Sequence, residues 1–287
     1  MRLDGRREST NVDDRRRLSG GKAAGMGVGG LIIAALITWI MGGNPLDTLQ
    51  QADLGQLAGG QQTEQREFTP EEQVLAKFSK QVLASTEDVW TEVFKQMGWT
   101  YKSPTMVLFT GSVQSGCGNA TSAVGPFYCS ADEKLYIDLS FFSSMKKQLG
   151  ADGDFAYAYV IAHEVGHHVQ HLLGTLDEAH ARMAKMNKAG ANKVSVRIEL
   201  QADFYAGIWG HYENKMFGSL EDGDLEEAIN CAQVIGDNYL QEKAQGYSQP
   251  ESFTHGTSAQ RMKWLKLGLN TGDIRRGDTF SIPETEL

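Results

Sequence analysis

Residues 159–171 read Tyr-Val-Ile-Ala-His-Glu-Val-Gly-His-His-Val-Gln-His, and this stretch decides the fold and the chemistry that we expect. Its apolar residues surround a His-Glu-x-x-His motif, which predicts a buried helix. Residues four apart share one face of a helix, so His163 and His167 can direct two imidazole nitrogens at one point. Such a pair suits a zinc ion (Zn2+), and Glu164 can take the proton of a zinc-bound water. The alternative is a helix with surface histidines.

The third ligand separates the classes of zinc site. Metzincins place it six residues after the second histidine, where this chain has Leu173, so that class is excluded. His171 lies one turn beyond His167, but three histidines over two turns span about 12 Å, too far to converge on one ion. Glu199 and Asp203 match the Glu-x-x-x-Asp pattern of the gluzincins. This resemblance implies that Glu199 binds zinc and that Asp203 orients a ligating histidine. The alternative is an ordinary acidic helix face.

In these residues and others, the chain from about residue 68 onward resembles the predicted neutral zinc metallopeptidase family of bacteria, the YpfJ-type proteins. Besides the two helices already described, the resemblance rests on residues 117–120, 125–129, 136–142 and 255–261. It implies a membrane-anchored protein with a zinc-peptidase-like domain. It says less about the substrate than about the fold.

The segment of residues 252–261 resembles the His-Gly segment followed by Arg that occurs late in related gluzincins. In those proteins the histidine is thought to steady the tetrahedral oxyanion, which implies a catalytic role for His255 as a donor opposite the zinc. His255 could instead cap the following helix or bind backbone. Arg261 is expected to pair with a carboxylate near the site, Asp203 being one candidate.

The N-terminal part predicts a membrane anchor. Residues 25–43 contain no charge, follow a basic segment and carry Trp39 near their far end, which is typical of a transmembrane helix. We therefore expect a disordered cytoplasmic tail (1–24), a transmembrane helix (25–43), a linker (44–67) and a domain (68–287). The positive-inside rule places that domain in the periplasm, anchored to the bacterial inner membrane. The alternatives are a cleaved signal peptide and a buried core helix.

Beyond the linker, the pattern predicts an α+β fold, and the family resemblance implies a mainly helical zincin-like domain with a small β-sheet. Thr69-Pro70-Glu71-Glu72 is typical of a helix start with a capping box. Residues 106–109 and 134–139 indicate strands around a Gly-rich loop. Cys117 and Cys129 flank that loop, and outside the cytoplasm such a pair favours a disulfide. Two reduced, buried cysteines are the alternative.

These features together predict zinc-dependent hydrolysis of a peptide bond by a membrane-anchored metallopeptidase that acts on a peptide or protein. An extended peptide is expected along a strand edge near Tyr136 to Asp138. The alternative is a noncatalytic, membrane-tethered metal-binding scaffold for envelope proteins. An intact Glu164 favours the enzyme, because binding needs no proton shuttle. The net charge of -9 disfavours a nucleic-acid partner.

Overall fold

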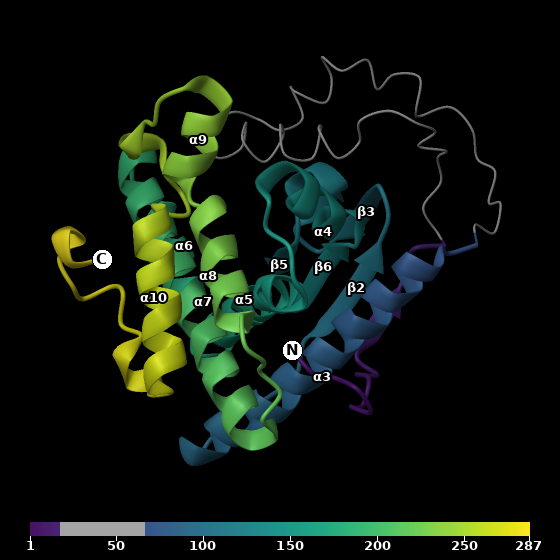
Figure 1. Cartoon of the computed structure of the whole chain (residues 1–287). Helices are drawn as coiled ribbons and strands as arrows, with labels where there is room; N and C mark the ends of the chain where they lie inside the picture. Colours follow the sequence, from purple (N-terminus) through teal and green to yellow (C-terminus); the bar gives the residue numbers. More distant parts are fainter. Residues whose placement is uncertain (18–66) are drawn as a thin grey trace.

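A small sheet and a set of long helices share the core of the molecule, seen in a computed structural model that describes residues 1–17 and 67–287 (Figure 1). Among the described residues, one sheet has four strands in the order β1-β2-β6-β5. The strands are β1 (Val12–Asp14), β2 (Thr105–Phe109), β6 (Lys134–Asp138) and β5 (Phe127–Cys129). β1 and β6 run parallel to β2, while β5 is antiparallel to β6 and forms an outer edge. A hairpin of β3 (Ser112–Ser115) and β4 (Gly118–Thr121) stands beside it.

Helix α5 (Asp154–Leu172) lies between the sheet and the long helix α7 (Lys188–Phe217) (Figure 1). Its apolar residues are buried on both sides, as expected for a helix with neighbours all round. In the described parts of the chain the other helices are α3 (Pro70–Gln96), α4 (Ser140–Ser144), α6 (Thr175–Met183), α7 (Lys188–Phe217), α8 (Asp224–Val234), α9 (Asp237–Gln245) and α10 (Ser258–Thr271). Short helical turns span Ser122–Val124, Met145–Leu149, Pro250–Ser252, Ile274–Arg276 and Glu284–Glu286.

The predicted start of α3 is confirmed. The Thr69 side chain accepts a hydrogen bond from the Glu72 backbone N–H, and the Glu72 carboxylate accepts one from the Thr69 N–H. Pro70 occupies the first helical position. These contacts satisfy N–H groups that the first turn of a helix leaves without partners.

Glycines allow the helices around the site to approach closely. A Cβ added to Gly207 on α7 would lie 2.3 Å from the Leu265 carbonyl oxygen, and one on Gly268 of α10 would lie 2.2 Å from the Phe204 carbonyl oxygen. A Cβ on Gly166 of α5 would lie 2.9 Å from the Ala202 carbonyl oxygen. Both α5 and α10 therefore pack directly on the α7 backbone, which places their polar side chains side by side.

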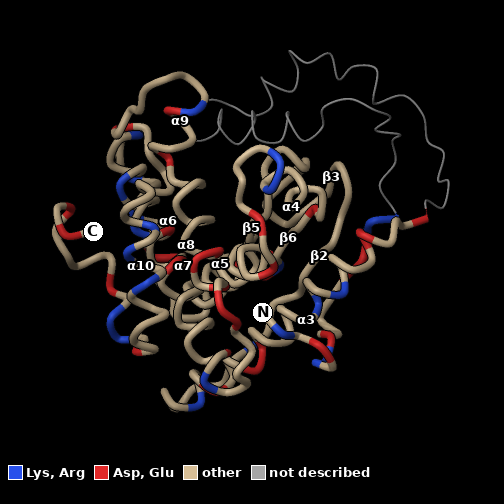
Figure 2. The backbone as a smooth tube through the Cα atoms, in the orientation of Figure 1, with Lys and Arg blue, Asp and Glu red and all other residues tan. Residues whose placement is uncertain are grey.

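Residues 1–17, predicted to be a disordered tail, are part of the folded domain. Strand β1 pairs in register with β2, with Val12 opposite Met106. Arg6 pairs with the buried Glu213 at 2.9 Å, and Arg7 pairs with Glu87 at 2.8 Å. Figure 2 shows acidic and basic residues interspersed along this segment and α3. Charged residues that we assigned to a disordered tail therefore pair with residues of the domain.

The predicted transmembrane helix and the single-pass inner-membrane localisation were wrong. Residues 25–43 themselves lie outside the described residues, as does most of the predicted linker. Within the described parts of the chain, no helix combines the length and the apolar character that crossing a bilayer requires. Because β1 precedes the predicted span and shares a sheet with β2 after it, a single crossing between them would separate two paired strands. The mainly helical character with a small sheet agrees with the prediction.

Candidate functional site

Three side chains from two helices converge on one point. His163 and His167 come from α5 and Glu199 from α7, and their candidate ligand atoms all lie within 4.8 Å of one another. His163 Nε2 is 3.1 Å from one Glu199 carboxylate oxygen, and His167 Nε2 is 3.5 Å from the other. The side chains are only 8%, 12% and 15% exposed, respectively. The structure thus brings together the three residues that the sequence nominated as metal ligands.

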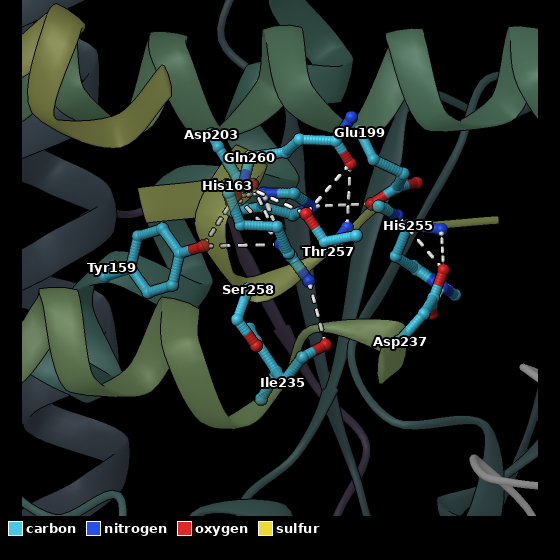
Figure 3. Close-up of polar contacts among 12 residues, drawn as sticks. Tyr159, His163, Glu199, Asp203, Ile235, Asp237, His255, Thr257, Ser258 and Gln260 are labelled. Carbon is cyan, nitrogen blue, oxygen red and sulfur yellow. Dashed lines mark hydrogen bonds and ion pairs between the residues drawn. The ribbon is translucent and has the colours of Figure 1, made fainter. Parts of the chain in front are cut away.

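A buried ionic cluster orients the first of these histidines (Figure 3). His163 Nδ1 lies 2.8 Å from Asp203 Oδ1, and the Tyr159 hydroxyl donates to the same oxygen at 2.5 Å. Arg261 donates to both Asp203 oxygens at 2.8 Å. Burial alone would raise the pKa of Asp203, but Arg261 and His163 outweigh it and hold that pKa at about 2. The predicted contacts of Asp203 with His163 and Arg261 are confirmed, and they turn His163 Nε2 toward Glu199.

An amide performs the same task for the second histidine. His167 Nδ1 lies 2.9 Å from Gln170 Oε1. The Gln170 amide nitrogen donates to the Ile198 carbonyl at 2.7 Å and to Gln201 at 3.0 Å, so its oxygen must face His167. Because that oxygen can only accept, the proton of His167 belongs on Nδ1 and Nε2 is available as a ligand atom.

The charges of the cluster suit a cation. Burial lowers the pKa of His167 to about 4, so its ring is neutral. Burial also acts to lower the pKa of His163, but the carboxylates of Asp203 and Glu199 outweigh it and raise that pKa to about 10. Burial would raise the pKa of Glu199, yet the nearby histidines lower it. The protonated ring of His163 thus lies between the carboxylates of Asp203 and Glu199. A metal ion that binds there would take the place of a proton on this ring and release it.

A cavity of about 490 Å³ opens onto the cluster. Glu164 lines it beside the two histidines, and burial raises the pKa of Glu164 to about 7. Apart from the cluster, Glu164 and a few polar groups, the walls are largely apolar; they include Val124, Phe127, Phe141, Val160, Met183 and Ile198. The cavity can therefore hold an uncharged, partly apolar molecule against the polar cluster.

His255 lies in the loop before α10 and lines the same cavity. It is the first residue of the segment 255–261, one of those on which the family resemblance rests. It does not cap that helix, because Thr257 and Gln260 form the capping box. His255 Nδ1 instead lies 3.1 Å from Asp237 Oδ1. The capping alternative for His255 is thereby excluded.

The disulfide between Cys117 and Cys129 is confirmed. It ties the β3–β4 hairpin to the edge strand β5, and Cys117 itself lines the cavity. Cys231 is a buried free thiol. The strand edge predicted for a peptide was misplaced, because β6 with Tyr136 to Asp138 is enclosed by β2 and β5. The outer strand on this side of the sheet is β5, whose Phe127 and Tyr128 line the cavity.

Two neighbouring histidines stay outside the cluster. His168 is fully buried between Lys102 and Tyr128, and His171 contacts Asp177. Sequence reasoning missed Tyr159, Gln170 and Asp237 as site residues. Tyr159 and Gln170 lie four residues before His163 and three after His167, so helical spacing could have found them. Nothing in the sequence pointed to Asp237.

Comparison with known proteins shows one matching family and several similar bacterial proteins. The sequence model of a family described as "Putative neutral zinc metallopeptidase" matches residues 1–280. The "Uncharacterized protein YpfJ" of Escherichia coli strain K12 is 50% identical over 287 residues, covering 98% of this chain and 99% of that protein. The "Uncharacterized protein Rv2575" of Mycobacterium tuberculosis strain H37Rv is 43% identical over 199 residues, 66% of each chain. No solved structure matches this sequence.

Proposed function

Because this chain belongs to the putative neutral zinc metallopeptidase family, we propose that it hydrolyses peptide bonds with a zinc ion held by His163, His167 and Glu199. One observation carries the proposal. Both histidines have Nδ1 engaged by a buried acceptor, so both Nε2 atoms face a carboxylate beside a buried glutamate, Glu164.

The donor set fits zinc. Two imidazoles and one carboxylate form a set typical of catalytic zinc, which keeps a further position for water or substrate. Asp203 and Gln170 hold the ligand rings in the required orientation, as partners of zinc-bound histidines commonly do. When bound, zinc would supply Lewis acidity toward a water molecule and a carbonyl oxygen.

The chain supplies the proton transfer. Glu164 lines the cavity and does not belong to the ligand cluster, so its carboxylate can take a proton from the attacking water. The same group can return this proton to the leaving amine. Water attacks the carbonyl carbon, the carbon–nitrogen bond breaks, and an acid and an amine result.

Two further parts of the cavity would serve the substrate. His255 lines the cavity and would donate to the oxygen that becomes negative during attack. The edge strand β5 offers its outer backbone groups to an extended peptide, since β6 occupies its other side. We assign the peptide to this edge rather than to β6.

The test compares zinc content with peptide cleavage in the same preparations. Glu164→Gln keeps the shape but removes the base, so zinc should stay while cleavage of a library-selected peptide falls by about 10²–10⁴-fold. Glu199→Ala should lose both zinc and cleavage. The controls are Glu242→Gln, an exposed glutamate on α9, and His171→Ala, which should change neither.

Two results would count against the proposal. Stoichiometric zinc in Glu199→Ala would mean that the third ligand is another residue. Equal residual cleavage in wild type and Glu164→Gln, or cleavage of no peptide at all, would favour a noncatalytic metal-binding scaffold.

A further inference from the structure

Asp237 is a fully buried carboxylate at the start of α9, and it holds the loop that carries His255 (Figure 3). Asp237 Oδ2 accepts hydrogen bonds from three consecutive backbone N–H groups, those of Thr254 at 2.7 Å, His255 at 2.7 Å and Gly256 at 3.0 Å. The Asp237 N–H donates to the Gly256 carbonyl at 2.9 Å. One side chain thus fixes the backbone on both sides of His255.

The loop that carries His255 also packs against α7. Gly256 has φ +92°, a conformation that favours glycine. A Cβ at this position would lie 3.2 Å from Leu200 and 3.3 Å from Val196, both on α7. Because α7 also carries Glu199, the loop is seated against the helix that supplies the third candidate metal ligand. Asp237 therefore sets the position of His255 relative to the metal cluster.

The remaining Asp237 oxygen acts on the histidine ring. Oδ1 lies 3.1 Å from His255 Nδ1, and the Thr254 hydroxyl lies 3.0 Å from the same nitrogen. A buried carboxylate can only accept, so it requires a proton on Nδ1, and the hydroxyl can accept from that proton as well. With Nδ1 directed at Asp237, Nε2 is the nitrogen through which His255 acts on a substrate.

We propose that Asp237 is a positioning residue for peptide hydrolysis, which fixes the orientation and the Nδ1 proton of His255 and stabilises positive charge on its ring. This inference rests on the proposed function. Its physical basis is that a carboxylate behind an imidazole sets the tautomer and the direction of the ring during catalysis. Asp237 touches no reacting atom, so its effect must pass through His255.

A double-mutant cycle tests that route. Loss of the His255 donor should lower kcat by about 10²-fold. Asp237→Asn should lower kcat by at least about tenfold with little change in KM, because the contact that it supports matures only in the transition state. In the His255→Ala background, Asp237→Asn should cause no further loss. Equal losses in both backgrounds would overturn the proposal, because they would mean that Asp237 only holds the fold.

The matched control is Asn238→Ala. Asn238 is the next residue along the chain, and its side-chain oxygen accepts a hydrogen bond from the Ser258 N–H at 2.8 Å. Asn238→Ala removes a hydrogen bond at the end of the same loop but leaves the Asp237 carboxylate in place. The kcat of this variant should therefore stay within about twofold of wild type. A loss as large as that of Asp237→Asn would assign the effect to loop anchoring and overturn the role of the carboxylate.

A second measurement needs no turnover. In zinc-loaded protein with ¹⁵N-labelled histidines, NMR should show a proton on Nδ1 of His255, whose signals are identified by their absence in His255→Ala. Asp237→Asn should move the neutral-ring proton toward Nε2. An unprotonated Nδ1 in an active wild type overturns this inference alone. A protonated Nδ1 in a protein that cleaves no peptide shows instead that the proposed function has failed.

Discussion

His168 follows a candidate ligand in the sequence but faces the opposite way, into the core. It is fully buried, its Nε2 lies 2.7 Å from the Lys102 carbonyl oxygen, and its Nδ1 lies 2.9 Å from the Tyr128 hydroxyl. The carbonyl can only accept, so Nε2 carries the proton and Nδ1 accepts from Tyr128. Burial lowers the pKa of His168 to about 4.

This burial predicts an acid-dependent loss of stability. The pKa of His168 is about 4 in the folded chain and about 6.5 when unfolded, so the unfolded chain binds more protons between these values. The stabilisation is complete above pH 6.5 and is lost as pH falls toward 4. The loss should be on the order of 3 kcal/mol. Chemical denaturation at several pH values, for wild type and His168→Gln, measures it.

The comparison of wild type with His168→Gln separates the effect of His168 on stability from that of the ligand histidines, which titrate in both proteins. The free energy of unfolding should fall more steeply with acid in wild type than in His168→Gln. Parallel pH profiles would show that His168 is protonated to the same extent in the folded and unfolded chains.

At the scale of residues, what could be predicted follows helical spacing. Helical spacing predicts His163 and His167 as a pair on one face, and Glu164 belongs to the same motif, whereas Glu199 and Asp203 follow from the resemblance to the gluzincin pattern. Asp237 could not be found in this way, because it reaches His255 from a different helix through a loop contact. Tertiary packing alone creates such a pair.

Among the elements, the crossing of α7 and α10 controls the candidate site from outside it. The two backbones meet at Gly207 and Gly268, and this contact sets where Arg261 of α10 meets Asp203 of α7. Ridges of side chains normally keep helix axes 8–10 Å apart, and glycine permits a closer approach. The site therefore depends on residues that have no polar group.

Gly268→Ala should separate the two helices. Its Cβ would meet backbone rather than a flexible side chain, so the cost should be about 1–3 kcal/mol of unfolding free energy. Zinc affinity should fall as well, because Arg261 moves away from the carboxylate that orients His163. Thermal unfolding and zinc titration measure the two effects. The control is Lys266→Ala, an exposed change on the same helix, and equal results for both variants would contradict the argument.

Elements with strong local signals were predicted, and short ones were not. The capping box defined the start of α3, and apolar runs indicated β2 and β6. Strands β1 and β5 have three residues each, too few to show an alternating pattern. Their strand character comes from the neighbour with which each one pairs, which no local window contains.

For the molecule as a whole, the N-terminal segment is a structural part of the domain. Glu87 on α3 is almost fully buried and accepts hydrogen bonds from Arg7 at 2.8 Å, Ser9 at 2.5 Å and Asn11 at 2.8 Å. Residues 1–17 also supply the outer strand β1. The apolar stretch at 25–43 predicts a membrane span from its composition. Sequence periodicity cannot reveal that the residues before this stretch pair with a strand after it.

Deletion of residues 1–17 should therefore destabilise the domain. Glu87 would lose charged and neutral donors and β2 would become an edge, so we expect a loss of at least about 2 kcal/mol of unfolding free energy. Urea denaturation measures it. Glu87→Ala should cost more in the full chain than in the truncated one, because its partners are present only in the former. An unchanged unfolding midpoint after truncation would contradict the prediction.

The parallel pairing of β1 with β2 also constrains how the protein is made. The ribosome releases residues 12–14 long before residues 105–109. Strand β1 of the nascent chain therefore cannot pair until β2 has been synthesised. Pairing between strands so far apart in the sequence is slow, because the entropy of closing a long loop is lost before any contact stabilises the pair. We expect the four-stranded sheet to complete only after residue 138 has been synthesised, with the apolar side of β2 exposed until then.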